Sequence, residues 1–91
     1  MSQPLQDSQP RLASGCRWGM HRDEPVVLYP EGMIRVEGTG RKILELCDGR
    51  SSLQQIVSSL AQQYGNADTE KVTRDVTMFL EALHHKRIVD Y

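Results

Sequence analysis

Alternating polar and apolar residues in the first third of the chain indicate three short strands. Residues 16–20 alternate with a period of two, 26–29 are β-branched and aromatic, and 33–37 place Ile34 and Val36 on one side. Connections this short force neighbouring strands to be antiparallel, since a parallel pair needs a crossover of a dozen or more residues. We therefore expect a three-stranded meander whose third strand lies at an edge.

The rest of the chain has the apolar spacing of three and four residues that is typical of amphipathic helices. One helix is expected from Thr39, as its N-cap, to Cys47. A second is expected from Ser51, where Ser51-x-x-Gln54 has the form of a capping box, to Gly65-Asn66. Its buried stripe is predicted to be Leu53, Ile56, Val57, Leu60 and Tyr64. Strands followed by helices in one short chain predict an α+β fold.

A third helix is expected from Asp68 or Thr69 to about His85, and two lines of side chains run along it. The first line, predicted to face the core, is Val72, Val76, Phe79 and Leu83. The second has the same spacing, is rotated by about 100°, and consists of Thr73, Thr77, Leu80 and His84. This second line fits the flank of a buried helix and the wall of a binding groove equally well.

Ninety-one residues are enough for one domain. A chain of this size buries roughly 60–65% of its unfolded surface, so a binding surface is easier to build than a walled active site. The first ten residues carry two prolines and three glutamines. They are expected to form a flexible N-terminal tail, with the folded domain at 11–91.

The charges are balanced, with 11 basic and 12 acidic residues and a net charge of −1. Such a chain has no long-range field to concentrate nucleic acid or an anionic membrane. Its apolar runs are far shorter than the ~20 residues that cross a bilayer, and its first residues lack the apolar stretch of a signal peptide. Cys16 and Cys47 lie far apart among apolar residues, as reduced thiols do. We expect no nucleic-acid or membrane partner and a cytoplasmic location.

No catalytic or cofactor motif is recognisable, and we expect neither an enzyme nor a bound cofactor or metal. His84 and His85 are adjacent on a helix and point about 100° apart, so they cannot chelate one metal together. Gly38-Thr39-Gly40 precedes a helix but lacks the lysine and the length of a P-loop, so a helix cap is favoured over an anion site. Trp18 and Tyr64 are interpreted as packing residues rather than as ligand contacts.

Several motifs in a fixed order carry a resemblance to a known family. Leu28-Tyr29-Pro30-Glu31-Gly32 precedes the third predicted strand, and Ile43-Leu44-Glu45-Leu46-Cys47-Asp48-Gly49 follows it. The apolar pattern of 52–64 and the segment 75–80 continue the order. With these motifs the chain resembles the PqqD family over roughly residues 11–90.

The resemblance implies a winged-helix-like domain of three antiparallel strands followed by three helices. It implies a peptide chaperone, without chemistry of its own, that binds the leader of the ribosomally made precursor PqqA. The chaperone would present that peptide to the radical-SAM enzyme PqqE in pyrroloquinoline quinone biosynthesis. Related recognition domains bind the leader as an added strand on the third strand, beside the third helix. Carried over to this chain, the peptide-binding residues are Met33, Ile34, Arg35, Val36, Glu37, Thr73, Thr77, Leu80 and His84.

The alternative interpretation is a winged-helix nucleic-acid-binding module whose third helix enters a major groove. The charges argue against it, because Glu70, Asp75 and Glu81 alternate with Lys71 and Arg74. Salt separates the two interpretations, since phosphate contacts weaken steeply with salt whereas strand addition does not. An enzyme comes third, with no residues to nominate.

Overall fold

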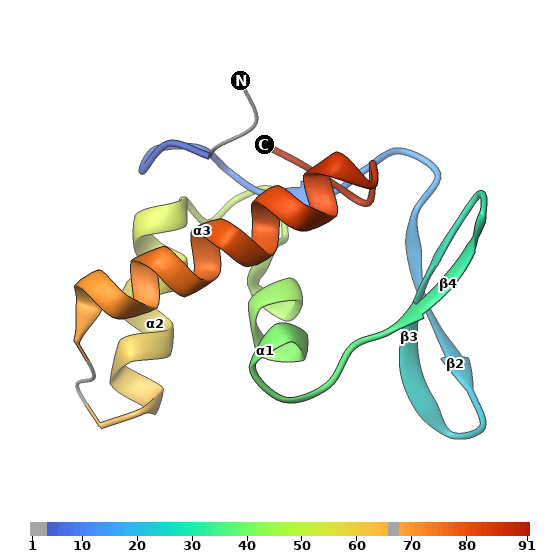
Figure 1. Cartoon of the computed structure of the whole chain (residues 1–91), viewed down its shortest axis with the longest axis horizontal. Coiled ribbons are helices and arrows are strands. Elements are labelled where there is room, and N and C mark those ends of the chain that lie inside the picture. Colours follow the sequence, from blue (N-terminus) through green and yellow to red (C-terminus); the bar gives the residue numbers. More distant parts are fainter. Residues whose placement is uncertain (1–3, 66–67) are drawn as a thin grey trace.

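The computed structural model describes residues 4–65 and 68–91, with four strands before the three helices and a fifth short strand after them. The strands β2 (Arg17–His21), β3 (Glu24–Tyr29) and β4 (Gly32–Arg35) form one antiparallel sheet in the spatial order β2-β3-β4. The helices are α1 (Gly38–Leu46), α2 (Leu53–Gln63) and α3 (Thr69–His85). Two further strands, β1 (Arg11–Leu12) and β5 (Val89–Asp90), pair antiparallel with each other. Figure 1 shows α3 crossing α1 and α2, with the three-stranded sheet projecting to one side of the helices.

The predicted α+β fold and the edge position of the third strand are confirmed. This strand is β4, and among the described residues it pairs with β3 alone. It is shorter than expected, because Val36 and Glu37 lie beyond its end and Glu37 is the N-cap residue of α1. The likeness to a winged helix stays a prediction.

Cross-strand pairs show which face of the sheet meets the helices. Trp18, Val27 and Ile34 lie opposite one another and therefore share a face. Val27 is fully buried in the core cluster, and Ile34 packs against that cluster. Trp18, on the edge strand β2, is still 37% exposed. Its side chain is therefore only partly packed, although a packing residue was expected. Ile34 therefore identifies the face of β4 that points toward the helices.

The turn between β2 and β3 is strained. Its two residues, Arg22 and Asp23, have φ values of 52° and 66°. Two positive φ angles match the twist of a two-residue hairpin, but they favour glycine and asparagine. Side chains with a Cβ carry a conformational penalty there.

Replacing the turn with Asn-Gly should therefore stabilise the protein. For Arg22→Asn/Asp23→Gly we expect a gain of about 1 kcal/mol, equivalent to a rise of roughly 4–8 °C in Tm. Asp23→Val, which places a β-branched residue at a positive φ, should lower Tm instead. Thermal melts followed by circular dichroism measure both changes. An Asn-Gly variant that melts at or below the wild-type temperature would contradict a strained turn.

The caps of the first two helices differ from the prediction. The capping box of α2 consists of Ser52 and Gln55, one residue later than expected. Ser51 and Gln54 have the same spacing, so the motif alone could not decide between the two pairs. Thr39 is not the N-cap of α1, and its hydroxyl contacts that of Tyr64 instead.

The end of α2 lies beside a gap in the described chain. Gly65 has a φ of +71°, as expected of a glycine that ends a helix. Asn66, the other residue predicted to end α2, lies outside the described residues.

Helix α3 spans the predicted residues, and Asp68 caps it by accepting a hydrogen bond from the Glu70 N–H. Its buried residues are Val76, Leu80 and Leu83. The assignment of Leu80 to a groove-facing line is wrong, because its side chain is 0% exposed. Phe79 is only half-buried. The buried stripe lies between the two expected lines because α3 packs on α2 and β5 at once.

The first described residues, 4–10, pack against the start of α2 rather than standing apart as a tail. The carbonyls of Ser8 and Gln6 accept hydrogen bonds from the amides of Leu53 and Gln54, at 2.8 and 3.1 Å. Pro10 is fully buried. These bonds satisfy N–H groups that the first turn of a helix leaves without helical partners. Residues 1–3 of the predicted tail lie outside the described residues.

Candidate functional site

The outer edge of β4 has no neighbouring strand among the residues that the structure describes. A two-residue turn joins β3 to β4 with Tyr29 opposite Gly32, and such a turn directs the Gly32 N–H to the Tyr29 carbonyl. Backbone groups alternate in direction along a strand, so Ile34 also bonds to β3. Met33 and Arg35 therefore direct both N–H and C=O to the open side. These groups are the donors and acceptors that a further strand would use.

The side chains of β4 give its two faces different character. Ile34 faces the helices, whereas Met33 (42% exposed) and Arg35 face the other side. The Arg35 guanidinium forms ion pairs with Glu24 and with Glu37, the second at 3.4 Å between Nη2 and Oε1. All three side chains are exposed, so these pairs contribute little stability, but they hold Arg35 beside the open edge.

The line of α3 predicted to wall the groove faces other parts of the chain. Thr73 borders a cavity with Gln6 and Leu53, and its hydroxyl donates to the Thr69 carbonyl at 2.7 Å. The ring of His84 lies 4.5 Å from that of Tyr91, next to β5. Leu80 is in the core and Thr77 is half-buried. Peptide contacts by Thr73, Thr77 and His84 stay a prediction, which these positions do not favour.

A different face of α3 lies next to the chain that follows β4. A Cβ atom at Gly40 would lie 3.0 Å from Cε1 of Phe79, so glycine is what lets α3 approach the first turn of α1 this closely. Earlier on α3, Val72 and Asp75 face the same end of α1. Sequence reasoning missed this face because it assigned Val72 and Phe79 to the core. The sequence feature that could have indicated this contact is the glycine at position 40, which leaves room for the ring of Phe79.

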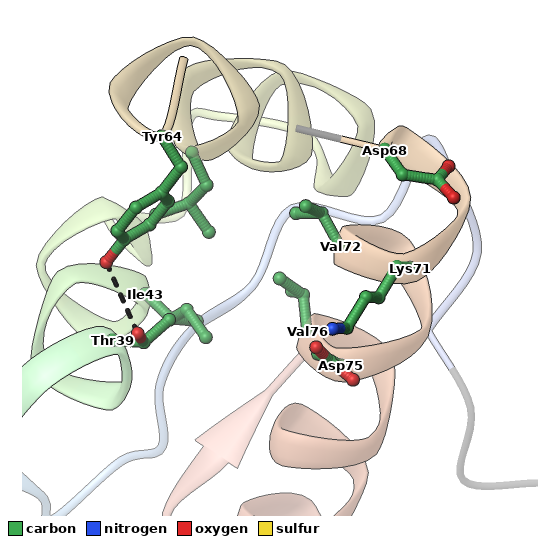
Figure 2. Close-up of a pocket in the computed structure, with 9 residues that line it drawn as sticks. Thr39, Ile43, Tyr64, Asp68, Lys71, Val72, Asp75 and Val76 are labelled. Carbon is green, nitrogen blue, oxygen red and sulfur yellow. Dashed lines mark hydrogen bonds between the residues drawn. The ribbon is translucent and has the colours of Figure 1, made fainter. Parts of the chain in front are cut away.

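A cavity of about 250 Å³ lies where α1, α2 and α3 meet (Figure 2). The Tyr64 hydroxyl closes one side of it, 3.2 Å from the Thr39 hydroxyl, and Lys42 Nζ lies 4.9 Å from the centre of the tyrosine ring. The hydrogen bond with Thr39, and then Lys42, hold the pKa of Tyr64 below its usual value. Tyr64 is 45% exposed and so does not end the buried stripe as expected. The remaining lining residues are Ile43, Leu60, Asp68, Lys71, Val72, Asp75 and Val76.

The reactive side chains of the described residues are not gathered into a further site. Cys16 and Cys47 are free, and burial raises the pKa of the Cys47 thiol to about 12, so it stays protonated at neutral pH. Within 4–65 and 68–91, no cluster of three or more histidine, cysteine or acidic residues is placed to hold a metal ion. Among the helices described, none has the length and apolar character needed to cross a membrane.

Fold and site together define a small α+β domain in which the edge strand β4 is open to a further strand. A family model described as coenzyme PQQ synthesis protein D (PqqD) matches residues 24–89. The chain belongs to the PqqD family, and the resemblance read from its motifs is confirmed.

Relatives and solved structures agree with this assignment. The PqqA binding protein of Pseudomonas aeruginosa is 36% identical over 86 residues, covering 92% of this chain and 91% of the relative. That of Methylococcus capsulatus is 41% identical over 66 residues, covering 72% and 68%. The solution NMR structure of the PqqD part of Methylobacterium extorquens PqqCD, described as a stand-alone RiPP recognition element, is similar with a TM-score of 0.79 at 29% identity, covering 99% and 97%. The crystal structure of PqqD from Xanthomonas campestris gives a TM-score of 0.60 at 31% identity, covering 96% and 98%.

Proposed function

We propose that this domain binds a PqqA-type precursor peptide as an added strand on the open edge of β4. In this proposal it presents the peptide to the radical-SAM enzyme PqqE in pyrroloquinoline quinone biosynthesis. The observation that carries the proposal is the open edge of β4 in a chain of the PqqD family. Both cysteines are free thiols, which supports work in the reducing cytoplasm.

Backbone bonding alone supplies about half of the affinity required. Met33 and Arg35 offer two N–H and two C=O groups, and four hydrogen bonds at roughly 1 kcal/mol each give about 4 kcal/mol. Micromolar binding needs about 8 kcal/mol, before the cost of ordering the peptide. Apolar side chains of the peptide must provide the rest, and Ile34 marks the face on which they would meet the helices.

The proposed role needs binding and no catalysis. An added strand uses backbone groups that are already in place, so the domain changes the shape and the location of the peptide without breaking a bond. The described residues support this role, because their titratable groups are spread over the surface or, as at Cys47, held protonated in the core.

Calorimetry with synthetic PqqA tests the proposal. We expect a dissociation constant in the micromolar range that changes by less than about threefold between about 50 and 200 mM salt, because strand addition neutralises no phosphates. A nucleic-acid-binding domain with six to ten phosphate contacts would lose roughly a thousandfold or more over the same range.

Absence of heat at tens of micromolar peptide would refute the proposal. A random DNA duplex serves as the matched ligand for the competing nucleic-acid interpretation and is expected not to bind. Adding PqqE to the preformed complex tests presentation, for which a ternary complex on size-exclusion chromatography is the expected result.

A further inference from the structure

We infer that the cavity between α1, α2 and α3 is an anchor site for one apolar side chain of the bound peptide, placed beyond the strand that adds to β4. This inference rests on the proposed function. It names a second contact region, on the helices, that the added strand by itself does not require.

The size of the cavity suits one side chain. Its volume of about 250 Å³ exceeds the roughly 150 Å³ at which a buried apolar cavity accepts benzene. It is smaller than the roughly 300–1,000 Å³ of sites for whole small molecules. A leucine, isoleucine or phenylalanine side chain therefore fits.

The lining favours an apolar occupant without net charge. Ile43, Leu60, Val72 and Val76 supply the apolar part of the wall. Around them, the acids Asp68 and Asp75 are balanced by Lys71 in the lining and by Lys42 over the Tyr64 ring. Figure 2 shows Ile43, Val72 and Val76 directed into the space, with Lys71 and Asp75 beside each other on α3.

The cavity lies within reach of a peptide on β4. The chain passes from Arg35, the last residue of β4, to Thr39 in the cavity lining in four residues, which span at most about 14 Å. An extended peptide that runs past Arg35 covers this distance with a similar number of residues. On the way it would pass Phe79, whose ring packs on Gly40 at the start of α1.

A second cavity on the other side of α3 supplies a matched control. It has about 230 Å³, is lined by Gln6, Leu53 and Thr73 among others, and lies against the N-terminal segment. Val72→Phe fills the proposed anchor site, and Ser58→Phe adds the same aromatic side chain at an exposed position of α2 that lines the second cavity. Neither substitution changes β4.

Calorimetry with synthetic PqqA should separate these variants. Burying one large apolar side chain contributes about 1.5–3 kcal/mol, so Val72→Phe should weaken binding about ten- to hundredfold. Ser58→Phe should change it by less than about threefold. Both proteins are first checked for a native amide spectrum. A Val72→Phe protein that binds within threefold of wild type would overturn the anchor site.

A direct measurement covers the case in which Val72→Phe fails to fold. In the wild-type complex, nuclear Overhauser contacts are expected between one apolar peptide side chain and the methyl groups of Ile43 and Val72. If the complex shows none, the inference is wrong. Wild-type protein that binds no PqqA would refute the proposed function itself, whereas normal binding without these contacts would refute only the anchor site.

Discussion

Leu80→Glu is expected to unfold the domain. Leu80 is 0% exposed and lies in the main core cluster, so a carboxylate there loses its hydration without gaining a partner. Substitutions that bury an unpaired charge belong to the class that costs more than about 4–5 kcal/mol. A domain of this length has roughly 5–14 kcal/mol of total stability, so most of it would be lost. Circular dichroism should show a lost or strongly lowered thermal transition.

Met78→Glu is the matched control for this charge. Met78 is on the same helix and 64% exposed, so the same new carboxylate stays in water. The free energy of unfolding of Met78→Glu should remain within about 0.5 kcal/mol of the wild-type value. If Leu80→Glu melted cooperatively near the wild-type temperature, Leu80 would have to line an open groove, as the resemblance to the PqqD family implied.

The error at Leu80 shows what helical periodicity leaves open. Both predicted lines of α3 keep spacings of four, three and four, and a core-facing stripe on a helix is at least about 100° wide. The true stripe, Val76, Leu80 and Leu83, takes residues from both lines. Only the packing of α3 against both α2 and β5 selects it, and this packing is set by contacts between residues distant in sequence.

Local patterns predicted the sheet and the open edge of β4 correctly. Short turns forced the antiparallel order, and the order placed the third strand at an edge. Contacts that are made by backbone groups could not be predicted in this way, because they leave no pattern in the sequence. The carbonyls of Gln6 and Ser8 bond to α2 whatever their side chains are, so a polar, proline-containing segment looked like a free tail. The pairing of β1 with β5, two residues in each strand, was missed for the same reason.

Proline substitutions at the adjacent positions 35 and 36 should have different effects. One should remove a hydrogen bond within the sheet and lower stability, and the other should remove a donor from the open edge and weaken peptide binding. Arg35 directs its N–H to the open side, whereas Val36, by the same alternation, directs its N–H toward β3. Proline deletes the N–H group at its own position. Arg35→Pro should therefore weaken PqqA binding, and Val36→Pro should lower stability.

The controls remove side-chain effects from both comparisons. Arg35→Ala loses the ion pairs with Glu24 and Glu37 but keeps the N–H group. Val36→Ala loses packing at a residue that is 5% exposed but keeps the N–H group. Val36→Pro should melt well below Val36→Ala, and Arg35→Pro should melt close to Arg35→Ala.

The affinity difference between Arg35→Pro and Arg35→Ala tests the docking model. One lost backbone donor leaves a peptide carbonyl without a partner, at a cost of about 1–3 kcal/mol, or roughly five- to a hundredfold in the dissociation constant. Titration of both proteins with PqqA, corrected for the folded fraction from their melts, gives this ratio. Equal affinities would mean that the peptide makes no hydrogen bond to the Arg35 N–H. Since Arg35 and Met33 are the residues of β4 with outward backbone groups, addition of the peptide to this strand would then be ruled out at its helix-proximal end.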